Sequence, residues 1–170
     1  MKTSLHQYSG FALIEALITT VIMTVGLTGL ALLQATSLRN SHSAMMRTHA
    51  IQLSAEYADL VRSNATAESA NIFAPQTFNL SSASPTRTAN CYTSTGCTPT
   101  EMANNDIANW FDTLKQQLPL EPPDGSAFSQ GARITQAGGI YTIEIKWTDD
   151  RTDTDDDGDL SKIFITSFQP

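Results

Sequence analysis

A single carboxylate, Glu15, is the most unusual candidate for chemistry in this chain, because it is the only charged side chain in an apolar run of 23 residues, 11–33. An acidic group at the centre of a membrane span costs on the order of 2.5 to 3.5 kcal/mol. We therefore expect Glu15 to have a cationic partner. A small-residue junction precedes it, and the sequence there is Ser9-Gly10-Phe11-Ala12-Leu13-Ile14-Glu15.

The two cysteines, Cys91 and Cys97, enclose five residues. This spacing differs from the C-x-x-C of redox enzymes, and a pair placed downstream of an export segment indicates a disulfide. On the loop-entropy model such a small closed loop stabilises the fold by roughly 2 to 2.5 kcal/mol. The cysteines therefore predict a structural bond, formed in an oxidising compartment.

A third cluster is acidic and resembles the loop of a calcium site, with carboxylates at the first, third, fifth and seventh positions and Gly158 at the sixth. These carboxylates belong to Asp153, Asp155, Asp157 and Asp159. The twelfth position is Phe164 where a bidentate Glu is expected, so the set of calcium ligands would be incomplete. Two interpretations stay open, a calcium site and a solvated acidic turn that protects a sheet from edge pairing.

No other pattern in the sequence indicates catalysis or a further cofactor. The chain lacks a G-x-S-x-G elbow, a phosphate loop and an H-E-x-x-H pair. Its 10 Lys plus Arg against 17 Asp plus Glu argue against a nucleic-acid surface. We therefore expect a structural protein and no enzyme.

The element that positions Glu15 is a predicted helix that can span a membrane. Residues 11–33 would measure about 35 Å as a helix, enough to cross a hydrocarbon core of about 30 Å. From 34 to 64 the pattern becomes amphipathic, so we expect one long helix whose second half packs on a head formed by residues 65–170. The predicted packing stripe comprises Met46, Ala50, Leu53, Tyr57, Leu60 and Val61. A plain membrane anchor is the alternative function of the first half.

The head is predicted to be α+β, with a small antiparallel sheet and a second, short helix after the disulfide loop. Residues 65–90 indicate a long connection with at most one short strand, near 78–80. Thr98 and Pro99 begin a helix that Pro119 stops. Its predicted apolar face comprises Met102, Ile107, Trp110, Phe111, Leu114 and Leu118. Residues 141–147 alternate as a strand with one buried face, and 163–168 supply a partner strand.

The segment from Gly10 to Glu15 resembles the leader-peptidase site of type IV pilins and of the pseudopilins of type II secretion. The resemblance implies the pilin fold, cleavage after Gly10 of a leader comprising residues 1–10, and N-methylation of Phe11. It also implies that Glu15, then the fifth residue, is an assembly contact. The amine that pairs with Glu15 would belong to a neighbouring subunit, although the i, i+4 spacing of Phe11 and Glu15 also allows a pair within one chain.

A second block, Cys91 to Cys97 followed by 106–110 and a closing Leu118-Pro119, resembles the PilV-type minor pilins. This implies a subunit at or near the pilus tip that helps to prime assembly, with motility, adhesion or DNA uptake as consequences. The implied partners are other minor pilins, the major pilin, the prepilin peptidase, the inner-membrane assembly platform and a tip adhesin. The chain would occupy the bacterial inner membrane, with its C-terminal domain periplasmic, and afterwards the extracellular pilus.

Two other functions stay open at this point. A minor pseudopilin of a type II secretion system would share the whole N-terminal third. A membrane-anchored periplasmic protein that binds calcium or another ligand, and never polymerises, would keep residues 1–10.

Overall fold

The computed structural model describes residues 9–79, 84–120, 131–149 and 161–170. The chain divides into two compact units, Met1–Ser41 and His42–Pro170. Helix α1 (Ser9–Ser63) begins in the first unit and ends in the second, as the long predicted helix requires.

In the first unit, every side chain from residue 13 to residue 41 is exposed. The threonine hydroxyls here donate to backbone carbonyls three or four residues earlier, which satisfies them inside an apolar helix. The donors are Thr19, Thr20, Thr24, Thr28 and Thr36. By length and composition, α1 is the one helix among the described residues that could cross a membrane.

The second unit contains a four-stranded antiparallel sheet in the order β1-β2-β3-β4. Its strands are β1 (Gln76–Asn79), β2 (Gly131–Ala137), β3 (Ile140–Thr148) and β4 (Ser161–Phe168). The predicted strands at 141–147 and 163–168 are confirmed as neighbours, β3 and β4. Strand β2 is a finding that the sequence reasoning lacked. It reaches β3 through Gly138 and Gly139, whose positive φ angles of 59° and 79° suit the tight turn of a hairpin.

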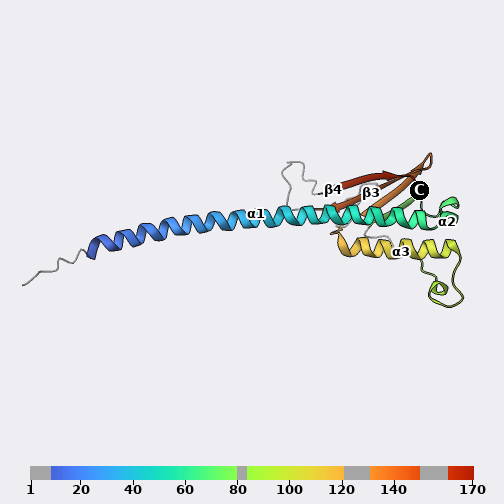
Figure 1. The fold of residues 1–170 in the computed structure, drawn as a ribbon, viewed down its shortest axis with the longest axis horizontal. Coiled ribbons are helices and arrows are strands. Elements are labelled where there is room, and N and C mark those ends of the chain that lie inside the picture. Colours follow the sequence, from blue (N-terminus) through green and yellow to red (C-terminus); the bar gives the residue numbers. More distant parts are fainter. Residues whose placement is uncertain (1–8, 80–83, 121–130, 150–160) are drawn as a thin grey trace, which may run out of the picture. The chain divides into compact units, whose positions relative to one another are not determined.

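Two helices, the end of α1 and α3 (Pro99–Gln117), pack with the sheet around one core. They run alongside each other in Figure 1, and the indole N–H of Trp110 donates to the Leu53 carbonyl at 2.8 Å. The Trp110 ring also contacts Tyr57 of α1 and Phe78 of β1, with centroid distances of 4.8 and 5.9 Å. Trp110 therefore ties both helices to the sheet.

The predicted amphipathic stripe of α1 is confirmed, since its members are buried apart from Leu60, which is partly buried against the core. The apolar face of α3 is confirmed with one correction. Met102 is 48% exposed, and Ala103 is buried in its place. Position 102 lies within the first turn of α3, outside the buried stripe of that helix.

The predicted connection from 65 to 90 is wrong in part, because it contains the short helices α2 (Ala65–Ser69) and η1 (Ala89–Tyr92). Asn64 explains α2. Its side-chain oxygen accepts from the Ala67 N–H at 3.1 Å, and its amide nitrogen donates to the Pro99 carbonyl at 2.7 Å. The cap ends α1 at Ser63 and joins the new turn to the start of α3.

Candidate assembly helix and disulfide segment

Glu15 lies on the exposed surface of α1, four residues after Phe11. Its backbone carbonyl accepts from the Thr19 hydroxyl at 2.9 Å. Within the described ranges, no ion pair involves the Glu15 carboxylate. Gly10 and Phe11 lie in the first turn of α1, which begins at Ser9. The geometry leaves the carboxylate available to a cation from outside the described part of the chain.

The side chains around Glu15 are large, apolar and exposed. Leu13 is 70% exposed, Leu17 is 64% exposed and Leu33, at the far end of the run, is 68% exposed. Apolar surface of this extent is unfavourable in water and favourable in lipid or against other helices. This part of α1 therefore requires an apolar environment that the described residues do not supply.

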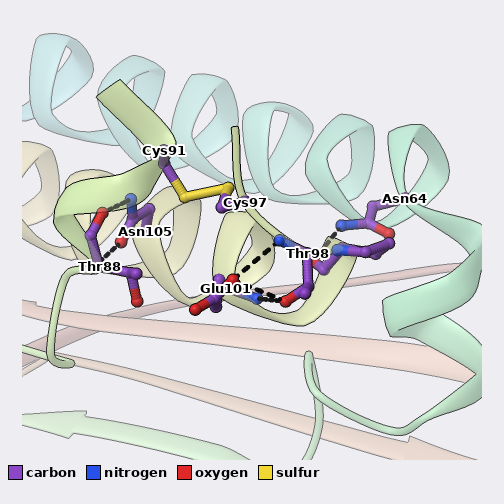
Figure 2. Close-up of a disulfide and its surroundings, with 8 residues drawn as sticks. Asn64, Thr88, Cys91, Cys97, Thr98, Glu101 and Asn105 are labelled. Atoms are coloured by element: carbon purple, nitrogen blue, oxygen red, sulfur yellow. Dashed lines mark hydrogen bonds between the residues drawn. A yellow bond between two sulfur atoms is a disulfide. The ribbon is translucent and has the colours of Figure 1, made fainter. Parts of the chain in front are cut away.

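The disulfide joins Cys91 to Cys97, with their Cα atoms 4.7 Å apart, immediately before α3 (Figure 2). The next residue, Thr98, caps that helix. The Thr98 hydroxyl accepts from the Glu101 N–H at 3.3 Å, and the Glu101 carboxylate accepts from the Thr98 N–H at 2.8 Å. The Thr98 hydroxyl also donates to this carboxylate at 2.9 Å, and the bonds that the carboxylate receives from the Thr98 backbone and then from the hydroxyl lower the pKa of Glu101. The cap fixes how the chain enters α3 after the disulfide.

The residues before the disulfide are bonded to the side of α3, and we call the whole stretch, residues 84–98, the disulfide segment. Thr88 exchanges two hydrogen bonds with the Asn105 side chain, at 2.7 and 3.1 Å (Figure 2). Closer to the C-terminal end of α3, Asp112 accepts from the Ser84 hydroxyl at 2.7 Å and forms an ion pair with Arg87. These two donors lower the pKa of Asp112. The segment is thus attached to α3 by bonds at both of its ends.

Sequence reasoning missed Arg87, Asn105 and Asp112 as the residues that hold this segment. They are ordinary polar residues, 17 to 28 positions from their partners. No spacing rule connects a loop residue with a helix residue at that separation. Only the fold brings them together.

The four aspartates of the predicted calcium loop, Asp153, Asp155, Asp157 and Asp159, lie outside the described residues. Phe164, at the twelfth position of that loop, lies in β4 and pairs with Ile145 of β3. In the described part of the chain, no three His, Cys, Asp or Glu side chains are grouped to hold a metal ion.

Comparison with known families gives one result. Residues 32–108 match the family model described as Type IV pilin Tt1218. The match supports a type IV pilin. It includes the second half of α1, the disulfide and the first half of α3. No curated protein and no solved structure matches the chain.

The architecture agrees with that result. A long apolar N-terminal helix, a small antiparallel sheet, a disulfide and a later helix together make the pilin fold. Type IV pilins are structural subunits and not enzymes, and they act through contacts with other pilins and the pilus machinery. Membrane anchoring and incorporation into a pilus both fit the exposed apolar half of α1.

Proposed function

We propose that this chain is a PilV-like minor pilin, placed at or near the tip of a type IV pilus, where it helps to prime assembly. The observation that supports this most is the single carboxylate on an exposed, membrane-length apolar helix, in a chain with the pilin fold. An anchor alone needs no charge at that position, whereas a subunit that must find a neighbour can use one. The role is structural and non-enzymatic.

Maturation begins at the junction of Gly10 and Phe11. Cleavage there removes residues 1–10 and leaves a methylated amine at Phe11, and the segment 11–33 remains in the inner membrane while 34–170 lies in the periplasm. Residues 34–64 continue the helix and residues 65–170 form the head. Because α1 already includes both residues of the junction, cleavage would leave the new amine on a helical turn, one turn before Glu15.

The new amine then gives Glu15 its cation. In a low-dielectric surrounding an unpaired carboxylate is costly, and an ammonium within hydrogen-bond distance offsets that cost. A subunit waiting in the membrane pairs the two groups within one chain, and a subunit in the filament pairs Glu15 with the amine of a neighbour. The partners are the major pilin, other minor pilins, the prepilin peptidase, the assembly platform and a tip adhesin.

Replacing Glu15 tests the assembly role. Glu15→Ala and Glu15→Gln should each lower the amount of this chain in sheared pili by at least about tenfold, because a hydrogen bond between charged groups is worth about 1.5 to 3 kcal/mol. The measurement is a quantitative immunoblot of sheared pili, normalised to the amount of the chain in membranes.

Thr20→Val is the matched control. Its hydroxyl is one turn further along the same apolar helix and bonds only to the Ala16 carbonyl, so the variant should enter pili as the native chain does. Native levels of Glu15→Ala in pili would remove the assembly role of the carboxylate.

A further inference from the structure

The second unit contains a cleft of about 530 Å³ between α1 and the edge strand β4. Helix α1 contributes Ser43 and Arg47 to its walls, and β4 contributes Lys162 and Phe164. Trp147 of β3 also lines the cleft. None of these residues takes part in the features described above for assembly.

The cleft opens beside an unpaired strand edge. Among the described strands, β4 pairs with β3 only, so alternate N–H and C=O groups on its other side have no neighbouring strand. Ile163 and Ile165 of this strand are 54% and 58% exposed. An edge with exposed aliphatic residues and no flanking strand is a surface on which an extended peptide can add.

Two cations and one buried indole nitrogen of the cleft have no acceptor among the described residues. Lys162 lies directly opposite Trp147 in the β3–β4 register, and Arg47 faces the same cleft from the helix. Neither cation forms an ion pair within the part of the chain that the structure describes. Trp147 is only 4% exposed, and its indole nitrogen has no hydrogen-bond acceptor among the same residues. A buried donor without an acceptor is costly, so a ligand that brings one is favoured.

We propose that this cleft binds an extended, acidic peptide segment of a partner protein, added as a strand to the free edge of β4. Side chains alternate along such a strand. Carboxylates on one face would meet Arg47, Lys162 and the Trp147 N–H, while aliphatic side chains on the other face would pack beside Ile163 and Ile165. Local charge complementarity argues for this occupant, because two cations, Arg47 and Lys162, meet in the cleft.

An anionic lipid headgroup is the competing ligand. A phosphate could neutralise Arg47 and Lys162, but it would leave the strand edge and the two exposed isoleucines without partners. The peptide uses all three features, so the observations favour it. The interaction does not depend on polymerisation and goes beyond the assembly role proposed above.

The test uses the full chain in a nonionic detergent, with ¹⁵N-labelled indoles observed by NMR. The probes are short blocked peptides of alternating Glu and Val, with Gln-Val and Lys-Val peptides of equal length for comparison. We expect millimolar Glu-Val peptide to shift the Trp147 indole signal, which the variant Trp147→Phe identifies. The Trp110 signal should stay in place, because its N–H already donates to the Leu53 carbonyl inside the core.

Charge variants make the test sharper. The double variant Arg47→Gln with Lys162→Gln should weaken binding of the Glu-Val peptide by at least about tenfold. The double variant Arg47→Glu with Lys162→Glu should bind the Lys-Val peptide more tightly than the Glu-Val peptide. Arg39→Gln removes an exposed cation of α1 outside the cleft and should bind as the native chain does. An unchanged Trp110 signal shows that each variant is folded.

Three results would overturn the proposal. These are no Trp147 shift with any peptide, an equal response to the Gln-Val peptide, and a shift produced only by nanodiscs containing phosphatidylglycerol. None of them bears on the assembly role, since the experiment contains no pili and leaves Glu15 intact.

Discussion

At the scale of single residues, Trp110 connects α3 with both α1 and β1 in the core of the head. It is 1% exposed, donates to α1 through its indole nitrogen and contacts aromatic rings of α1 and β1. We predict that Trp110→Phe lowers the free energy of unfolding by about 1 to 3 kcal/mol, because it leaves the buried Leu53 carbonyl without this donor and opens space in the core. Urea denaturation of the detergent-solubilised chain measures this.

Met102 offers the matched control on the same helix. Its side chain is 48% exposed, so Met102→Ala should change the free energy of unfolding by less than about 0.5 kcal/mol. Equal effects of the two variants would show that Trp110 is not the anchor described here.

Asp112 provides a second prediction at this scale, which concerns pH. Hydrogen bonds from Ser84 and Arg87 hold the pKa of Asp112 below its ordinary value of 3.8. Because the pKa is lower in the folded state, the contribution to stability is fully present above about pH 3.8 and is lost as the pH falls through the folded-state value. We predict that Ser84→Ala raises the pKa of Asp112 toward 3.8, measured by NMR titration of its carboxyl carbon.

Ser69→Ala is the comparison for that titration, since the Ser69 hydroxyl bonds to the Thr66 carbonyl and not to Asp112. Ser69→Ala should leave the titration midpoint of the Asp112 carboxyl group unchanged. A midpoint that does not move in Ser84→Ala would mean that the bond from Ser84 has no effect on the carboxyl group.

At the scale of elements, Gly131 decides whether β1 can pair with β2. Its φ of 143° is open to glycine, and a Cβ built there would lie 1.9 Å from the Phe78 carbonyl oxygen of β1. We predict that Gly131→Ala separates the two strands and costs at least about 2 kcal/mol, measured by urea denaturation.

The turn between β2 and β3 supplies the control for that variant. Gly138 also has a positive φ, of 59°, but a Cβ there meets no atom within 4 Å. Asn tolerates this conformation, so Gly138→Asn should cost about 1 kcal/mol or less. Comparable losses in the two variants would argue against the clash with Phe78.

The elements that the sequence predicts well are those whose signals are local. The Thr98-Pro99 start of α3 and the alternation of β3 are both present in a few consecutive residues, and both elements form as expected. Strand β2 also has a local signal, the Gly138-Gly139 turn that joins it to β3. The cap of α2 is local as well, since Asn64 accepts from the Ala67 N–H three residues later, but the bond that joins Asn64 to Pro99 spans 35 positions and has no signal in the sequence.

The cleft could not have been predicted, for a related physical reason. Its residues come from α1, β3 and β4, and they meet only through the register that places Lys162 opposite Trp147. A shift of that register by one residue would turn Lys162 to the other face of the sheet. The alternation of β3 fixes which of its faces is buried, but it does not say which residue of β4 lies opposite Trp147.

At the scale of the whole molecule, the chain combines an apolar helix that needs other helices or lipid with a head that has its own core. The proposed processing site at Gly10 and Phe11 can be recognised in the sequence, because a peptidase would read it in a linear chain. The sequence does not show which group pairs with Glu15, since the partner would be an amine created by cleavage, on this chain or on its neighbour. On the proposed function, assembly would therefore be a property of the processed subunit.

Mass spectrometry of pili sheared from cells decides whether this chain is a minor pilin. We predict a peptide that begins at N-methylated Phe11, present at a small fraction of the abundance of the major subunit. Abundance equal to that of the major subunit would contradict a minor role. Recovery of the chain only from membranes, still joined at Gly10 and Phe11, would contradict its function as a pilus subunit.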